Sequence, residues 1–494
     1  MRSRAMQRKT RVTVCLAGVA WVLAACSTPA ASPAPTAPAA AAAPTAAPAA
    51  AKPAAAASPV AAASSAPAAS PAAAASASPA AAASPAVAAA PSAAPAAAAA
   101  APPTGTPIKI GVMDDVTGVG AIEGALMRIS TELAVQRANT SGGINGHPVQ
   151  VTYVDPKGDA NQALQLAQQL AQQDNVDVLT GGLFSPECLG VQNLVSKLQI
   201  VYVPLNGCAS DVLTSKSCDK YTFRVYPAGR QTSDTSIGFQ VKAFGTKWGI
   251  IYADYALGQS TLATSEAALQ KNGAEYVAKI PVPLGEPNVT PYVTKIPTDG
   301  SIQVLNVVET GSDLTRVMSV IQQFGINQKV AIVTALGKES FAGVYPDALN
   351  GAIITGTRPS DGIPGNADDA KYMADWLAVA KANADITSPL GGIDHVTPGN
   401  NNGYNAYMSM TALILAMRKA SFTGKADTDK LIAAFETLNV PQGPDFPDGQ
   451  LIMNKDDHQG RTTYYLLKIN GQKEEVIQTI PADTLPTIGD CKIQ

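Results

Sequence analysis

From Ile108 onward, short apolar runs alternate with longer amphipathic segments, and this alternation limits the possible folds more than any other feature of the chain. Strands that alternate with helices form parallel sheets covered on both faces, and such sheets bind ligands beyond the carboxyl ends of their strands. The first series predicts strands over 108–112, 149–154, 176–180 and 200–204, and helices over 123–139, 160–173 and from Pro186.

A second series starts after Pro227, so the chain of 494 residues is expected to form two globular α/β lobes. It predicts strands over 248–252, 276–282, 302–308, 330–334 and 352–357, and helices over 260–272 and 312–324. Further helices are expected over 369–383, 404–419 and 431–437, and a terminal hairpin over 449–453 and 463–469.

The first 25 residues are typical of an export signal. Five cationic residues precede the apolar stretch 12–23, which is too short to span a bilayer comfortably. The string Leu-Ala-Ala-Cys-Ser over 23–27 resembles a bacterial lipobox, so we expect residues 1–25 to be removed and Cys26 to be acylated. A plain secretory signal with an incidental cysteine is the alternative.

Residues 26–105 consist almost entirely of Ala, Pro, Ser and Thr, with Lys52 as the one charged residue. Such a composition cannot build a core, and its frequent prolines exclude a long helix. We therefore expect a disordered, extended tether that lets an anchored domain work away from the membrane. A solubilising spacer with no length requirement is the alternative.

The stretch 178–187 is predicted to run from a buried strand, through a glycine pair, into a helix. Ser185 is expected at the N-cap, Pro186 at the first helical position and Glu187 at the positive end of the helix dipole. Free backbone N–H groups beside a serine hydroxyl can hold a carboxylate or another small polar group. Alternatively, Ser185 only caps its helix.

Composition argues against several classes of function. The net charge is −3 and no basic cluster follows the first eleven residues, so nucleic acid is not expected as a partner. Six cysteines and three histidines show no metal-ligand spacing, and neither a metal nor a cofactor is predicted. The absence of a Gly-x-Ser-x-Gly elbow and of a P-loop predicts a protein that is not an enzyme, with a secreted α/β enzyme as a remote alternative.

Several motifs in order resemble the branched-chain amino-acid-binding (Leu/Ile/Val-binding) family of type I periplasmic binding proteins of ABC transporters. They are Ile-Lys-Ile-Gly-Val at 108–112, Ser-Gly-Gly-Ile-Asn-Gly at 141–146, Val-Leu-Thr-Gly-Gly at 178–182, Tyr-Val-Pro at 202–204, Thr-Phe-Arg-Val at 222–225 and Asp-Tyr-Ala-Leu-Gly at 254–258. The resemblance implies two doubly wound parallel-sheet lobes joined by three crossings, near 225–227, 355–357 and 439–449. The first lobe is expected over 107–226 and 358–440, and the second over 227–357 and 441–494.

The resemblance also implies which residues hold a ligand in the cleft. The loops with Phe184 and Ser185, and with Leu205, Asn206 and Gly207, are expected to hold a ligand carboxylate from the first lobe. Leu257 and Thr310 are expected to contribute from the second lobe. Leu336 aligns where amino-acid binders offer an acidic residue, with Glu339 three residues later and Glu309 on another loop.

The function implied is that of an extracytoplasmic, lipid-anchored monomer that captures a small solute and delivers it to an ABC permease. The expected ligand is a branched-chain-type amino acid, or an amide or organic acid. A lipoprotein that senses a ligand and regulates a partner shares every one of these features and stays an alternative.

Four cysteines remain in the mature protein, which is exported to an oxidising compartment. Cys208 and Cys218 lie ten residues apart around a polar loop, so a disulfide between them is predicted, leaving Cys188 with Cys491. Four free buried thiols are the alternative.

Overall fold

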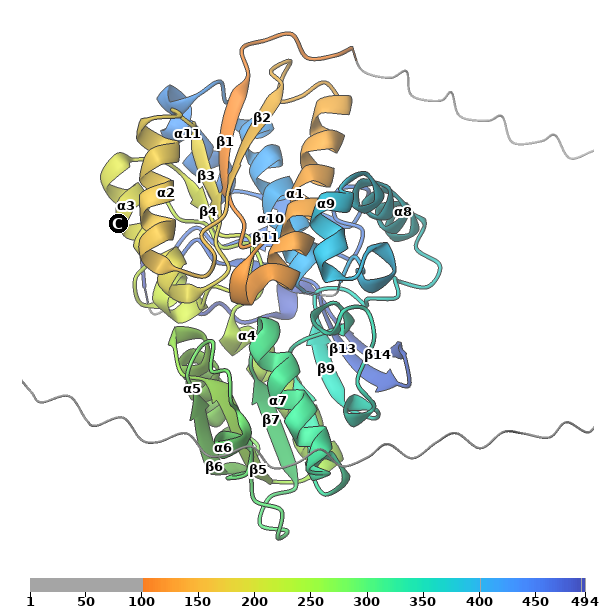
Figure 1. Cartoon of the computed structure of the whole chain (residues 1–494). Helices are drawn as coiled ribbons and strands as arrows, with labels where there is room; N and C mark the ends of the chain where they lie inside the picture. Colours follow the sequence, from red (N-terminus) through yellow and green to blue (C-terminus); the bar gives the residue numbers. More distant parts are fainter. Residues whose placement is uncertain (1–100, 400, 490, 494) are drawn as a thin grey trace, which may run out of the picture. The chain divides into compact units, whose positions relative to one another are not determined.

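The computed structural model describes residues 101–399, 401–489 and 491–493. Their helices and strands are shown in Figure 1. The predicted signal peptide, the lipidation site Cys26 and the tether as far as residue 100 lie outside the described residues.

A four-stranded parallel sheet forms in the order β2-β1-β3-β4. Its strands are β1 (Ile108–Met113), β2 (Val149–Val154), β3 (Val178–Gly181) and β4 (Tyr202–Val203). Ile108, Ile110 and Val112 of β1 are fully buried, as an apolar run in a sheet covered on both faces should be. The strands predicted for the first series are confirmed.

Helices cover both faces of this sheet (Figure 1). On one face α1 packs with α8 and α10, and on the other α2 packs with α3. The helices are α1 (Ala121–Thr140), α2 (Ala160–Gln172), α3 (Ser185–Leu198), α8 (Ala367–Ala382), α10 (Asn402–Ala420) and α11 (Thr428–Glu436). Asp159 caps α2, because its Oδ1 accepts the N–H groups of Asn161 and Gln162, both at 2.8 Å.

A seven-stranded sheet forms in the order β14-β13-β9-β8-β7-β5-β6. Its strands are β5 (Lys247–Ala253), β6 (Glu275–Val282), β7 (Val304–Val308), β8 (Ala331–Thr334), β9 (Ile353–Gly356), β13 (Tyr464–Asn470) and β14 (Lys473–Ile480). The helices beside it are α4 (Gly229–Phe244), α5 (Ala256–Lys271), α6 (Thr290–Val293) and α7 (Gly311–Gln323). Strands β5 to β9 are parallel to one another, so the predicted α/β class with parallel sheets is confirmed.

The end of the chain differs from the prediction. Segments 449–453 and 463–469 do not pair as a hairpin. Instead β11 (Leu451–Met453) pairs antiparallel with β10 (Asn439–Val440) and β12 (Gly460–Thr462) in a separate small sheet. Strand β13 lies antiparallel between β9 and β14. The hairpin prediction was wrong because β13 turns at Gly471 directly into β14, a strand that was not predicted.

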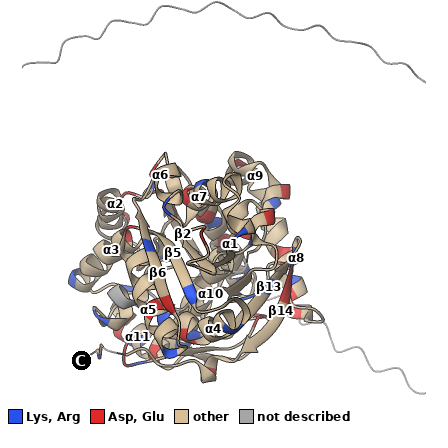
Figure 2. Cartoon of the chain, turned by 90° about the horizontal axis from the view of Figure 1, so that it is seen from below, with Lys and Arg blue, Asp and Glu red and all other residues tan. Residues whose placement is uncertain are grey.

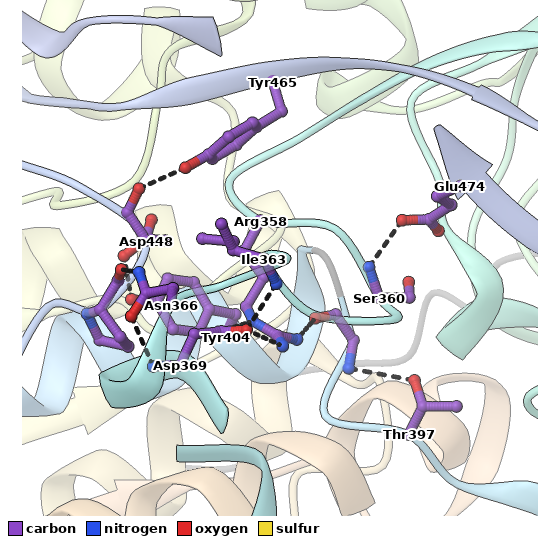
Figure 3. Close-up of polar contacts among 12 residues, drawn as sticks. Arg358, Ser360, Ile363, Asn366, Asp369, Thr397, Tyr404, Asp448, Tyr465 and Glu474 are labelled. Atoms are coloured by element: carbon purple, nitrogen blue, oxygen red, sulfur yellow. Dashed lines mark hydrogen bonds and ion pairs between the residues drawn. The ribbon is translucent and has the colours of Figure 1, made fainter. Parts of the chain in front are cut away.

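A buried polar cluster joins segments that are distant in the sequence, as Figure 3 shows. The Arg358 guanidinium pairs with the Asp369 carboxylate, with Nε 2.8 Å from Oδ1, and both side chains are buried. Tyr404 of α10 donates to the Asp448 carboxylate, and Tyr465 of β13 donates to the Asp448 carbonyl. Buried polar and charged groups need such partners. The cluster therefore fixes α10 and β13 against Asp448, which lies on the segment between them in the sequence.

Figure 2 shows positions of Lys, Arg, Asp and Glu scattered along the ribbon. Among the described residues, no helix is both long enough and apolar enough to cross a membrane.

Candidate functional site

A cavity of about 210 Å³ opens where the carboxyl ends of strands from both large sheets meet. One wall comes from loops after β3 and β4, and the opposite wall from loops after β5, β7 and β8. The first turn of α10 completes it. This is the position expected for a ligand in parallel α/β sheets.

Five of the predicted ligand residues line this cavity, and four do not. Those on the wall are Asn206, Gly207, Leu257, Thr310 and Leu336. The others, Phe184, Ser185, Leu205 and Glu339, are each no more than 1% exposed and pack behind the wall. The structure therefore brings together the loops that were predicted, but not every side chain on them.

The polar groups at the first turn of α3 already form hydrogen bonds within the protein. The helix begins at Ser185 with Phe184 as its N-cap, so the predicted capping role of Ser185 was wrong by one residue. Glu187 Oε2 accepts the N–H groups of Leu183 at 3.3 Å and Phe184 at 3.1 Å. The Ser185 hydroxyl oxygen accepts the Ala209 N–H at 3.1 Å.

A second carboxyl group lies beside Glu187. Burial, and then the charge of Glu187, raises the pKa of Asp115 to about 8. Burial raises the pKa of Glu187 to about 7. Isolated helix N-termini attract anions, but here Glu187 already accepts the N–H groups of Leu183 and Phe184, so these groups are not free to bind a ligand carboxylate.

Gly207 lies on the cavity wall with φ +71°, a left-handed conformation that side chains disfavour. A Cβ atom at this position would also clash with the Leu183 carbonyl oxygen. Glycine is therefore required by the loop, and only the backbone can serve a ligand here.

Glu309 is the one acidic side chain on the wall formed by the described residues. It is 3% exposed, and its buried Oε1 atom has no hydrogen-bond partner in the described part of the chain. Burial, and then the charge of Asp313, raises the pKa of Glu309 to about 8. Because a buried polar atom without a partner is costly, Glu309 favours a ligand group that donates to its carboxyl oxygen or, when the carboxyl group is protonated, accepts its O–H.

Tyr255 stands on the same side of the cavity and also has a buried hydroxyl without a partner among the described residues. Burial, and then the charge of Glu309, holds its pKa well above the usual range. Tyr255 was not among the predicted ligand residues, although its aromatic side chain within the motif at 254–258 was a signal that could have identified it.

Asparagine side chains connect the loop after β4 with the start of α10. Asn206 donates to Asn402 Oδ1, and Asn405 Nδ2 donates to Asn206 Oδ1 at 2.8 Å. Asn401 Nδ2 donates to the carbonyl oxygens of Ala335 at 2.7 Å and Thr355 at 3.1 Å. All four asparagines line the cavity, so the network holds its amide groups in fixed positions. Residues 401, 402 and 405 were missed because only tertiary packing brings α10 to this site.

Arg224 is the one cationic residue that the described residues place on the wall. Its Nε donates to the Cys208 carbonyl at 3.0 Å, and its Nη1 to the carbonyls of Tyr226 and Pro227, both at 2.9 Å. The guanidinium thus holds together the protein backbone around the cavity.

The predicted disulfide between Cys208 and Cys218 was wrong. Cys208 pairs with Cys188, and Cys218 pairs with Cys491. The first turn of α3 lies over the loop after β4, with 6.2 Å between the Cα atoms of Cys188 and Cys208. The π-helix at Asp211–Ser215 then leads the chain towards the C-terminal segment, which short sequence spacing could not reveal.

No cluster of three or more potential metal ligands occurs among the residues that the structure describes.

The family model for periplasmic binding protein matches residues 107–474. The chain belongs to this family. The resemblance to its Leu/Ile/Val-binding members, drawn from motifs alone, is thereby confirmed.

Individual relatives are distant. Leu/Ile/Val-binding protein homolog 8 of Brucella abortus (strain 2308) is 24% identical over 357 residues, which cover 68% of this chain and 81% of that protein. Homolog 6 of the same organism is 26% identical over 206 residues, covering 41% of this chain and 51% of that protein. The chain thus spans about half the length of homolog 6.

Solved structures share the fold. A periplasmic binding protein from Burkholderia mallei has a TM-score of 0.66 at 21% identity, covering 78% of this chain and 98% of that one. An ABC transporter solute-binding protein from R. palustris in complex with benzoate has a TM-score of 0.65 at 19% identity, covering 79% and 99%.

Proposed function

We propose that this periplasmic binding protein is the extracytoplasmic solute-binding lipoprotein of an ABC importer. It would capture a small polar solute in the cavity between the two sheets and deliver it unchanged to the permease. The family assignment, the signal-like residues 1–25 and Cys26 support this proposal. The lobe boundaries at 226/227, 357/358 and 440/441 belong to the same proposal.

The observation that carries the ligand assignment is the pair of buried, unpartnered oxygens, Glu309 Oε1 and Tyr255 Oη. They favour a ligand that carries both an acceptor for the Tyr255 O–H and an N–H or O–H donor for a Glu309 oxygen, because binding such a ligand removes the cost of leaving both groups unpaired. A ligand ammonium would also offset the burial that keeps Glu309 protonated. A branched-chain-type amino acid or an amide fits this requirement.

An organic acid fits less well. Arg224, the cation of the described wall, already donates to backbone carbonyls, and the α3 terminus holds the Asp115 and Glu187 carboxyl groups. Backbone N–H groups of the loop at 205–207 would then have to hold the carboxylate. The names of relatives point to both classes, since one Brucella group is named for Leu/Ile/Val and one structure holds benzoate.

A thermal-shift screen of the purified protein against amino acids, amides, ureas, and aliphatic and aromatic acids tests this proposal. A binder at about 100 times its dissociation constant adds about 2.7 kcal/mol to the free energy of unfolding. We expect hits among compounds with a donor group. Leu336→Trp, which fills the cavity, should lose the shift, whereas Leu390→Trp, away from the cavity, should keep it. No hit in any class, or hits unaffected by Leu336→Trp, would contradict the proposal.

A further inference from the structure

The cavity does not end at the loops. It continues between α4, α5 and the face of the seven-stranded sheet, along a set of polar side chains that we call the polar pocket. The polar pocket comprises Ser233, Ser236 and Gln240 of α4, Ser260 and Ser265 of α5, and Asn306 of β7.

This polarity is unusual for a helix–sheet interface, which is normally apolar. Ile237 is an apolar exception on this stretch of the wall, and farther along the same face Val241, Trp248, Leu269 and Val304 form an ordinary apolar core. Ser233, Ser236 and Gln240 recur at the spacing that places them on one face of α4, and each is no more than 6% exposed. Small hydroxyl side chains thus stand where the neighbouring turns bury large apolar ones, and the space they leave is part of the cavity.

A directed chain of hydrogen bonds orients Asn306. Its Nδ2 donates to Tyr276 Oη at 2.9 Å, and Tyr276 Oη donates to Ser265 Oγ at 2.8 Å. Ser265 Oγ in turn donates to the Thr261 carbonyl at 2.6 Å. Nδ2 keeps a second N–H. The hydroxyls of Ser236 and Ser265 donate their hydrogens to backbone carbonyls, so their oxygens and the Asn306 carbonyl oxygen present mainly acceptors to the polar pocket. Glu309, with its buried unpartnered Oε1, stands on the wall of the same cavity.

The polar pocket of the described residues contains no charged side chain. A charged ligand group would therefore lose its hydration without gaining a counter-ion, and an apolar group would leave the Asn306 carbonyl oxygen without water or a partner. An uncharged hydrogen-bond donor satisfies both conditions. The whole cavity of about 210 Å³ is smaller than the roughly 300–1,000 Å³ of pockets for drug-sized ligands, so the ligand is small.

We infer that the ligand is elongated and ends in an uncharged donor, a hydroxyl or carboxamide group, that enters the polar pocket and binds the Asn306 carbonyl oxygen. This inference rests on the proposed function, because it assumes that the other end of the same ligand is held by the loops at the mouth of the cavity.

The test uses pairs of compounds that share a head group and differ only in a terminal hydroxyl or methyl group. They are L-5-hydroxynorvaline with L-norleucine, 4-hydroxybutanamide with pentanamide, and 5-hydroxypentanoate with hexanoate. Each compound is titrated into the purified full chain by calorimetry. For any pair that binds, the hydroxyl compound should bind about tenfold more tightly than its methyl partner, which is the effect of about one buried hydrogen bond.

Asn306→Leu, which keeps the size but removes the acceptor, should abolish this preference. Asn272→Leu, at the exposed end of α5, is the matched control and should keep it. Ser236→Val is a second variant, which narrows the polar pocket. It should lower the affinity for the hydroxyl compound at least about fivefold, while the affinity for L-alanine or acetamide, which are short, stays unchanged.

Equal or tighter binding of the methyl compounds by the unmodified protein would overturn the inference and leave the proposed function standing. A hydroxyl preference that survives in Asn306→Leu would also overturn it. If none of the six compounds binds, the proposed ligand classes fail, and this inference fails with them.

Discussion

Ser185 shows how far residue types alone could predict the site. Its strand, glycine pair and helix start were predictable from local sequence, and the strand and the helix begin within two residues of the expected places. The orientation of its hydroxyl was not predictable, because Ala209 approaches only through the fold of the loop after β4. The residues missed, Tyr255 and the α10 asparagines, likewise reach the cavity through tertiary packing.

Ser185→Ala is therefore expected to act on stability. Removing the hydroxyl leaves the buried Ala209 N–H without its acceptor, which should lower the free energy of unfolding by about 1–3 kcal/mol in urea denaturation. Measuring ligand affinity in this variant tests whether Ser185 also holds the ligand, as the family resemblance implies. A loss of affinity with unchanged stability would show that Ser185 contacts the ligand and that the hydrogen bond to Ala209 contributes little.

At the scale of elements, periodicity predicted the parallel strands of both sheets because each is a separate apolar run with a helix to follow. It predicted β13 but gave it the wrong partner, and it missed β14. Strand β14 contains the exposed residues Val476 and Ile477 next to several charged residues. Such a pattern does not distinguish an edge strand from a loop. Pairing partners also cannot be read from alternation, so β11 was assigned to the wrong neighbour.

At the scale of the whole molecule, six buried carboxyl groups share one electrostatic property. Burial raises the pKa values of Asp114, Glu123, Glu187 and Asp448 to about 7, and those of Asp115 and Glu309 to about 8. Unfolded carboxyl groups lose their protons near pH 4. Between about pH 4 and 8 the folded protein therefore holds protons that the unfolded chain releases, and stability falls as pH rises.

We expect the Tm of the unliganded protein to be several degrees higher near pH 6 than near pH 8.5, since about 1 kcal/mol shifts Tm by roughly 2–4 °C in domains of 150–250 residues. Scanning calorimetry over this range checks the sign. A Tm that rises between pH 6 and 8.5 would mean that these carboxyl groups are ionised and paired in the folded protein.

The central claim is that a solute binds between the two sheets through Glu309. Its most direct test is calorimetric titration of the strongest hit from the screen into the unmodified protein, Glu309→Leu, and Glu275→Leu, a control on the exposed end of β6. Loss of the carboxyl group and its hydrogen bond to the ligand should weaken binding by about 1–3 kcal/mol in Glu309→Leu, with the control unchanged. Equal dissociation constants in all three proteins would contradict the claim.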